Sequence, residues 1–335
     1  MKLSVVDSTF TLGEQDRRRM AGFSAPRHLP RRCVGDGRVD DGRPLSKKLW
    51  PLPLRRAYAP CMSDQTGQEQ GDVYTHGHHE SVLRSHASRT AVNSAAYLIP
   101  HLSHGLKVLD VGSGPGTITA DFAQLVAPGE VLGLDRAPEV VAAATVLARE
   151  RHLHNLSFET GDVYNLDFSD DSFDVVHAHQ VLQHLTDPVE ALREMRRVAK
   201  PGGIVAVRDA DFHGMSWYPQ LPELEEWMAL YQQVARHNQA EPDAGRRLLH
   251  WAQAAGFSDV TPSSANWLYA TEEQRAWLAA VWADRTVGSA FAEQAVAYGF
   301  ADAATLTRIS AGWRAWGAAK DGWFLMPNGE IVARA

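Results

Sequence analysis

Cysteine is scarce in this sequence, and long apolar runs are absent from it. The 335 residues include only two cysteines, Cys33 and Cys61, which are too few for a disulfide framework or a cysteine-rich zinc site. No stretch approaches the roughly 18 apolar residues that a membrane-spanning helix needs. The composition, 44% hydrophobic and 22% charged, excludes collagen, coiled coils and global disorder. We therefore expect a globular, cytoplasmic protein without a membrane span.

Basic residues are few outside the first 61 positions. Residues 1–61 contain 13 basic and 6 acidic side chains, whereas the remainder contains 20 basic and 34 acidic ones. An acidic body is unsuited to phosphate contacts, so we expect it to have no nucleic-acid partner. Segment 1–61, interrupted by proline and glycine, is expected to be a mostly disordered basic extension. A targeting peptide, a tail for nucleic acid or membranes, and an upstream extension of a frame that starts at Met62 all remain open.

From residue 107 the sequence alternates between apolar runs and amphipathic stretches. The predicted strands span 107–112, 130–135, 156–163, 173–182 and 204–211, and the predicted helices span 116–127, 138–152 and 187–200. Strands that alternate with helices pair in parallel, which predicts a three-layer α/β sheet. Residues 106–212 would form this core, preceded by a helical lid over 62–105.

Tryptophan is concentrated in the second half, where nine of the ten follow residue 216. Residues 213–335 are predicted to form a helical substrate cap that also holds two strands. The predicted helices span 221–238, 245–257, 271–287 and 303–319, and the predicted strands span 259–270 and 323–335, the second with a Pro-Asn-Gly turn. The tryptophans would either pack the cap or line a hydrophobic pocket.

The strongest motif is Asp110-Val-Gly112-Ser113-Gly114-Pro-Gly116, at the predicted turn from the first strand into the first helix. Glycine lets the backbone turn tightly and lets a ligand approach without a Cβ in the way. Dinucleotide-binding enzymes carry G-x-G-x-x-G at this point, whereas the spacing here is G-x-G-x-G. The carboxylate of Asp110 is poorly suited to a pyrophosphate and suits the ammonium group of an amino-acid moiety.

Polar residues also follow the next three predicted strands. These are Asp135 and Arg136 after the second strand, Gly161, Asp162 and Val163 after the third, and His179 and Gln180 at the end of the fourth. Because ligands of parallel sheets bind at the carboxyl ends of the strands, we expect these residues to line one crevice with the glycine loop. Each residue alone has an ordinary structural explanation, so their order at successive strand ends is what indicates a site.

Taken in order, DVGSGPG, GLD, GDV, FDVVHAHQVLQHL and VAKPGG resemble the motifs of class I S-adenosylmethionine-dependent methyltransferases, most closely the small-molecule branch that includes the ubiquinone and menaquinone methylases. The resemblance covers about residues 106–212. It implies a Rossmann-like, seven-stranded sheet whose final strand is antiparallel, with about 271–320 as a helical insertion. It also implies S-adenosylmethionine as the cofactor.

The same resemblance implies roles for the motif residues. Asp110 and the loop Gly112–Gly116 would hold the methionine end of the cofactor, Asp135 its ribose, and Asp162 and Val163 its adenine, while His179 and Gln180 would flank the sulfonium. A looser similarity links residues 74–90 and the tryptophan-rich insertion to methyltransferases that act on thiols of dithiol natural products. It implies a place in secondary metabolism.

Methyl transfer requires a nucleophile aligned with the sulfonium methyl group, and it requires no metal. A thiol needs little activation, whereas a phenol or a ring carbon benefits from a general base. The candidates for such a base or for a positioning group are His179, His78 and Asp209. His86, Arg84 and Arg89 belong to the predicted lid. Which histidine, if any, is a base stays open at this point.

The expected function is therefore methyl transfer to a small-molecule acceptor, either a natural-product thiol or, alternatively, a quinol or phenol. An NAD(P)-dependent oxidoreductase is less favoured, because of the loop spacing, Asp110 and the lack of a Tyr-x-x-x-Lys pattern. A non-catalytic cofactor-binding protein and a macromolecular methyltransferase are the remaining alternatives. The sequence does not indicate the oligomeric state.

Overall fold

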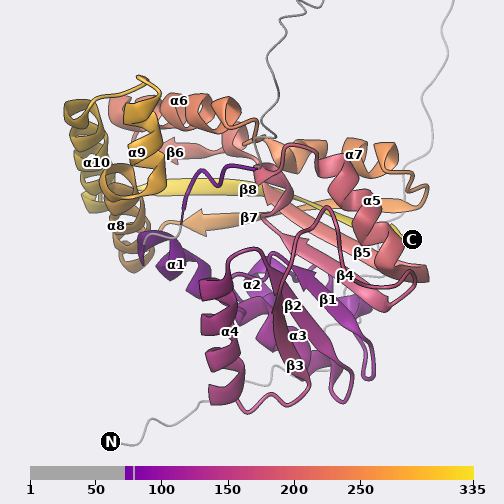
Figure 1. Ribbon diagram of the computed structural model, residues 1–335. Helices are drawn as coiled ribbons and strands as arrows, with labels where there is room; N and C mark the ends of the chain where they lie inside the picture. Colours follow the sequence, from indigo (N-terminus) through magenta and orange to yellow (C-terminus); the bar gives the residue numbers. More distant parts are fainter. Residues whose placement is uncertain (1–71, 78–79) are drawn as a thin grey trace, which may run out of the picture. The chain divides into compact units, whose positions relative to one another are not determined.

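The computed structural model of this chain describes residues 72–77 and 80–335, so the predictions for residues 1–61 and for His78 lie outside the described residues. The described part contains one eight-stranded sheet with helices on both sides (Figure 1). The strands are β1 (Val108–Val111), β2 (Val131–Asp135), β3 (Leu156–Thr160), β4 (Phe173–His179), β5 (Ala199–Ala210), β6 (Ser216–Tyr218), β7 (Val260–Tyr269) and β8 (Trp323–Arg334).

The strand order is β3-β2-β1-β4-β5-β8, with β7 on the far side of β8 and the short β6 also paired to β8. Strands β1 to β5 pair in parallel, and β8 is antiparallel to both β5 and β7. This arrangement confirms the predicted Rossmann-like sheet with a final antiparallel strand. It has eight strands instead of the predicted seven, because the short β6 was not predicted. In register, Asp110 lies between Gly133 of β2 and His177 of β4, so the carboxyl ends of these strands meet at one edge.

Most of the helices from α3 onward follow the predicted amphipathic stretches closely. The helices are α1 (Glu80–Ala87), α2 (Ala91–Ser94), α3 (Thr117–Val126), α4 (Pro138–Glu150), α5 (Pro188–Val198), α6 (Pro222–His237), α7 (Leu248–Ala254), α8 (Glu272–Gly288), α9 (Ala290–Ala297) and α10 (Ala303–Ala318). Asp187 caps α5 by accepting from the Glu190 amide, and Pro188 occupies the first turn, where its missing N–H costs nothing. Thr271 and Gln274 form a capping box at the start of α8.

The structure corrects the predicted turn in the last strand and adds one helix. β8 runs unbroken through Pro327, Asn328 and Gly329, because β5 and β7 pair with it on its two sides. Gly329 serves close packing there: a Cβ on it would lie 2.0 Å from the carbonyl oxygen of Gly245. Helix α9 was not predicted, because its eight residues, AFAEQAVA, show no clear polar face.

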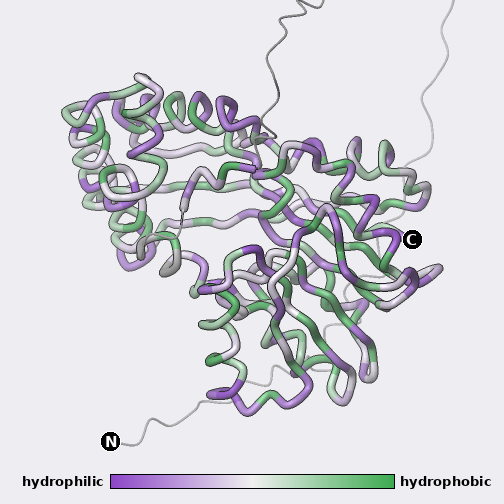
Figure 2. The backbone as a smooth tube through the Cα atoms, in the orientation of Figure 1, coloured by the Kyte–Doolittle hydropathy of each residue, from purple (hydrophilic) through white to green (hydrophobic). Residues whose placement is uncertain are grey.

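Alternate residues along the central strands pack against separate apolar clusters on the two sides of the sheet. Leu109 and Val111 belong to the cluster with α5 and α7, whereas Val108 belongs to the cluster with α3. A third cluster, rich in tryptophan, joins α6, α8, α9 and α10. In Figure 2 the surrounding helices alternate between hydrophobic and hydrophilic residues. No helix within the described residues is both long and apolar enough to cross a membrane.

Candidate active site

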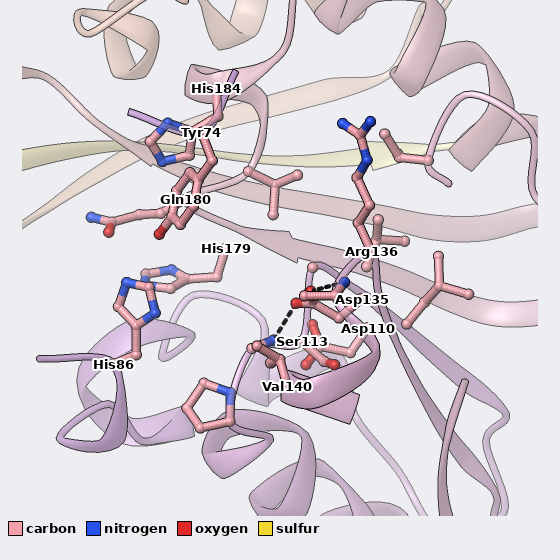
Figure 3. A pocket seen from close by; sticks show the side chains of 18 of the residues that line it. Tyr74, His86, Asp110, Ser113, Asp135, Arg136, Val140, His179, Gln180 and His184 are labelled. Carbon is pink, nitrogen blue, oxygen red and sulfur yellow. Dashed lines mark hydrogen bonds between the residues drawn. The ribbon is translucent and has the colours of Figure 1, made fainter. Parts of the chain in front are cut away.

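A cavity of about 470 Å³ opens at the carboxyl ends of β1, β2 and β4; we call it the main cavity. Every predicted cofactor-binding residue except Gly116 lines it, namely Asp110, Gly112, Ser113, Gly114, Asp135, Arg136, Gly161, Asp162, Val163, His179 and Gln180. Figure 3 labels six of these, Asp110, Ser113, Asp135, Arg136, His179 and Gln180. The sequence motifs therefore converge on one site. Lining residues also come from the segment that precedes α2, including Asp72, Tyr74, His86 and Arg89.

The glycine loop shapes one wall of the main cavity through three left-handed backbone positions. Gly112 has φ +66°, and a Cβ there would lie 2.4 Å from Val181; Gly116 has φ +80°, and a Cβ there would lie 2.5 Å from Phe158. The absence of a Cβ at these two positions lets the loop pack closely against Val181 and Phe158. Gly114, with φ +55°, differs because a Cβ on it would meet nothing within 4 Å. Its open side faces the space where a ligand can approach the backbone.

Asp110 is held rigidly at the base of the loop. It is only 3% exposed. One carboxylate oxygen lies 2.7 Å from Nδ1 of His177, and the other accepts a hydrogen bond of 2.5 Å from the Thr119 hydroxyl. His177, fully buried beside it, positions this carboxylate and does not line the main cavity. Because a carboxylate oxygen has more than one lone pair, Asp110 keeps acceptor capacity toward a ligand.

Asp135 connects the end of β2 to the glycine loop. Its carboxylate accepts hydrogen bonds from the amides of Gly114, at 2.9 Å, and Ala137, at 3.1 Å, as the dashed lines in Figure 3 show. The neighbouring Arg136 is exposed and reaches the carbonyl oxygen of Asp72 at 3.4 Å. Asp162 lies after β3 and accepts from the amide of Tyr164 at 3.0 Å. Two carboxylates thus lie along one side of the crevice.

The end of the main cavity away from Asp135 and Arg136 is lined by polar and aromatic side chains (Figure 3). These are His179, Gln180, His184, Tyr74 and His86. Neither ring nitrogen of His179 has a hydrogen-bond partner among the described residues. Burial lowers the pKa of His179 well below its usual range, and nearby positive charge lowers it further. Burial likewise lowers the pKa of His184 to about 3. Both rings are therefore neutral and weakly basic at neutral pH.

The segment before α1 lies along the main cavity and contributes Asp72 and Tyr74 to its wall. The Asp72 carboxylate accepts from the amide of Thr186 at 2.8 Å and from the hydroxyl of Tyr164 at 3.2 Å. Arg89, after α1, donates a short hydrogen bond to the side-chain oxygen of Gln180. The sequence identified His86 and Arg89 as lid residues but missed Asp72 and Tyr74. These two precede the first regular element, where no periodicity marks them.

Asp209 does not join the site as the sequence suggested. Its side chain, on β5, is fully buried and does not line the main cavity. It accepts a hydrogen bond of 3.2 Å from the amide of Gln183, in the 3₁₀ turn Leu182–His184. Burial raises the pKa of Asp209 to about 8. Asp209 therefore stabilises the turn that follows β4, and we do not place it against a substrate.

The residues of the main cavity fit S-adenosylmethionine. The open side of Gly114 leaves room for a ligand against the backbone, and the hydroxyl of Ser113 is buried without a partner among the described residues. Carboxylates at Asp110 and Asp135 match an ammonium group and hydroxyl groups, respectively. Apolar side chains, including Val140, Val163 and Leu134, provide surfaces for a flat ring.

Several known proteins are similar to this chain. A family model described as a methyltransferase domain matches residues 102–273. An uncharacterized methyltransferase of Schizosaccharomyces pombe is 35% identical over 268 residues, which cover 77% of this chain and 95% of that protein. The ubiquinone/menaquinone biosynthesis C-methyltransferase of Bdellovibrio bacteriovorus is 41% identical over 103 residues, 31% of this chain and 43% of that protein. Among solved structures, the YcgJ protein of Bacillus subtilis covers 71% of this chain and 96% of its own, with 21% identity and a TM-score of 0.48.

The matched family region contains the entire parallel half of the sheet, and with it the glycine loop and the carboxylates at the ends of β2 and β3. The relative from Schizosaccharomyces pombe extends the match over nearly its whole length. From these matches and the geometry of the main cavity, we conclude that this chain belongs to the class I S-adenosylmethionine-dependent methyltransferases.

Proposed function

We propose that this methyltransferase methylates the thiol of a small natural product. Asp110 and the glycine loop would hold the methionine end of S-adenosylmethionine, Asp135 its ribose, and Asp162 with Val163 its adenine. When bound, the cofactor supplies an electrophilic methyl group on a sulfonium. The protein's own contribution is to align the acceptor and exclude water, which supplies up to about 7–11 kcal/mol in well-oriented reactions. The lid segment with Asp72 and Tyr74 supports this second role.

The low basicity of the histidines at the acceptor end carries the proposal of a thiol. His179 and His184 both have pKa values far below the usual range, so neither is a good proton acceptor. Arg89 lies beside both of them and contributes positive charge. A nearby positive charge favours the ionised form of an acidic group. A thiol, with a free pKa of about 8.5, would ionise here without a strong base, whereas a phenol, with a pKa of about 10, would ionise less readily.

Methylation of a quinol or phenol is the alternative, and the Bdellovibrio relative, named for quinone biosynthesis, favours it. That match covers only 31% of this chain, however, so it leaves most of the acceptor side unmatched. An aromatic thiol, the corresponding phenol and a hydroquinone offer a direct comparison on similar rings.

The test is the rate of S-adenosylhomocysteine formation with these three acceptors at pH 7. We expect the thiol to react at least about tenfold faster than the other two, because its nucleophile is ionised to a greater extent. Faster turnover of the phenol or hydroquinone would replace the proposal by the alternative. Calorimetric titration with S-adenosylhomocysteine and with NAD(H) provides the control on the cofactor, and only the former should bind.

A further inference from the structure

A second, smaller cavity adjoins the main cavity beneath the helical cap; we call it the inner pocket. Its volume is about 40 Å³. It shares four lining residues with the main cavity, namely His86, Arg89, Gln180 and His184. Aromatic side chains form half of its remaining wall, namely His76, Phe212, Trp267, Tyr269, Trp277 and Trp282. The inner pocket therefore continues from the histidine end of the main cavity into the cap.

Arg285, on α8, lines the inner pocket and does not line the main cavity. Its side chain is 4% exposed, and its guanidinium carbon lies 4.4 Å from the centroid of the Trp282 ring. Its Nε and Nη2 atoms have no hydrogen-bond partner among the described residues. Burial lowers the pKa of Arg285 to about 10, so the group is still charged at neutral pH. A buried charge without a hydrogen-bonded partner is costly to the fold.

Other buried arginines of the described chain have partners that Arg285 lacks. Arg208 lies 3.6 Å from a carboxylate oxygen of Glu330 and donates to the carbonyl oxygen of Asn93 at 2.8 Å. Arg275, ten residues before Arg285 on the same helix, donates to the carbonyl oxygen of Ala270. No acidic side chain of the described residues forms an ion pair with Arg285. Among the described residues, Arg285 is thus a buried cation with neither a hydrogen-bonded nor an ion-pair partner.

We infer that Arg285 binds a carboxylate of the methyl acceptor, so that the acceptor is a small aromatic thiol acid. A cavity of roughly 10–15 Å³ by the same measure holds one water molecule, so the inner pocket has room for a carboxylate. Guanidinium groups match carboxylates in geometry and charge. The aromatic wall suits a ring that carries this group. The inference rests on the proposed function, and it names the substrate class of that site.

The carboxylate that binds Arg285 could belong to the methionine end of the cofactor instead of the acceptor. The following experiment distinguishes these two ligands. The acceptors are mercaptobenzoate and thiophenol, which differ only in the carboxylate. The variants are Arg285→Met, which removes the charge, Arg285→Lys, which keeps it, and the matched control Arg275→Met on the same helix. For each variant, KM and kcat are measured with both acceptors, and the Kd of S-adenosylhomocysteine is measured by calorimetry.

We expect Arg285→Met to raise KM for mercaptobenzoate by at least about 30-fold, as for loss of one partner of a buried charge pair. KM for thiophenol and the Kd of S-adenosylhomocysteine should change less than about threefold, since neither ligand engages Arg285 in this proposal. Arg275→Met should leave the ratio of the two KM values unchanged. Loss of S-adenosylhomocysteine binding in Arg285→Met would assign Arg285 to the cofactor and overturn the proposal.

A binding measurement keeps this proposal distinct from the proposed function. Benzoate, which has no thiol, should quench tryptophan fluorescence of the protein saturated with S-adenosylhomocysteine, because Trp282 lies beside Arg285. The quenching should vanish in Arg285→Met and persist in Arg275→Met. Where neither thiol is methylated but benzoate still binds through Arg285, the thiol proposal fails and the anion site stands.

If Arg285→Met does not fold, Arg285→Lys is used in its place. This variant should bind benzoate several-fold more weakly than the wild type, because lysine lacks the planar guanidinium group. Benzoate binding that is equal in the wild type and in the folded Arg285 variant contradicts the proposal.

Discussion

The three glycines of the loop that borders the main cavity have different roles. Gly112 and Gly116 lack a Cβ so that the loop can pack against Val181 and Phe158, whereas Gly114 leaves open space beside a ligand. Asp135 joins the loop to β2 through the amide of Gly114. The three glycines of one motif therefore serve different purposes, which substitutions can separate.

We expect Gly114→Arg to abolish binding of S-adenosylhomocysteine while the protein still folds. The new side chain starts in open space and enters the main cavity, and its left-handed backbone costs only about 1–2 kcal/mol. Gly202→Arg is the matched control, because Gly202 also has a positive φ and open space around it but lies away from the cavity. Calorimetry and thermal melting are the measurements. Binding retained by Gly114→Arg would contradict the assignment of the loop.

The buried carboxyl of Asp209 gives a second expectation at this scale, for stability against pH. Its pKa is raised to about 8 in the folded protein, above the value of about 4 in the unfolded chain. Between about pH 4 and about pH 8 the carboxyl group is therefore protonated in the folded state and ionised in the unfolded state. Stability from this group is therefore present at low pH and is lost as pH rises through about 8. Relative to Asp209→Asn, the wild type should lose on the order of 3 kcal/mol of unfolding free energy between pH 5 and 8. Urea unfolding at both pH values checks this, and a difference that stays constant with pH would show that Asp209 is ionised throughout.

Elements built on a clear period were predictable from the sequence, whereas those decided by tertiary neighbours were not. The five parallel strands and helices α3 to α5 follow from apolar runs and amphipathic stripes, and the motif residues at their ends predicted the main cavity. The Pro-Asn-Gly stretch of β8 became strand because two neighbouring strands pair with it and Gly329 packs closely against Gly245. Arg285 carried no signal, because a lone arginine on a helix usually marks a solvated face.

The tryptophan-rich cluster of the cap also belongs to the scale of elements. Trp313 of α10 is fully buried and lies 4.8 Å from Trp227 of α6, between ring centroids, and 5.5 Å from Phe324 of β8. It therefore joins two helices to the last strand. Of the two roles open for the tryptophans, Trp313 fills the core, while Trp267, Trp277 and Trp282 line the inner pocket.

We expect Trp313→Ala to lower the free energy of unfolding by about 3–5 kcal/mol, the usual cost of removing a buried tryptophan side chain. Trp323→Ala is the control, because Trp323 is 36% exposed and should cost far less. Denaturant unfolding monitored by circular dichroism measures both variants. Equal effects of the two substitutions would mean that the cap cluster contributes little to stability.

At the scale of the whole molecule, the two cavities draw on different parts of the chain. The main cavity is lined by residues from Asp72 to Leu185, whereas the inner pocket extends to Arg285 and Met326. The parallel half of the sheet thus presents the motif residues, and the cap supplies most of the wall that contacts an acceptor in our proposal. This division agrees with the sequence analysis, in which motifs of the parallel half indicated the cofactor class and left the acceptor open.

We expect a chain that begins at Met62 to keep the melting temperature and the methyl-transfer rate of the full chain. Every strand and helix of the described residues lies between Glu80 and Arg334, and the residues that line the two cavities begin at Asp72. Thermal melting and the rate of S-adenosylhomocysteine formation, compared between the two chains, provide the measurement. Lost turnover with an unchanged melting temperature would give residues 1–61 a direct part in the reaction.

The position of β8 between β5 and β7 has a consequence for synthesis on the ribosome. About 113 residues of chain separate the end of β5, at Ala210, from the start of β8, at Trp323. At roughly 5–20 residues per second, the nascent chain exposes the unpaired edge of β5 for about 6–23 s before its partner emerges. Unpaired strand edges are sites of aggregation. A nascent chain stalled before β8 should therefore depend on chaperones for solubility, whereas the completed chain should not.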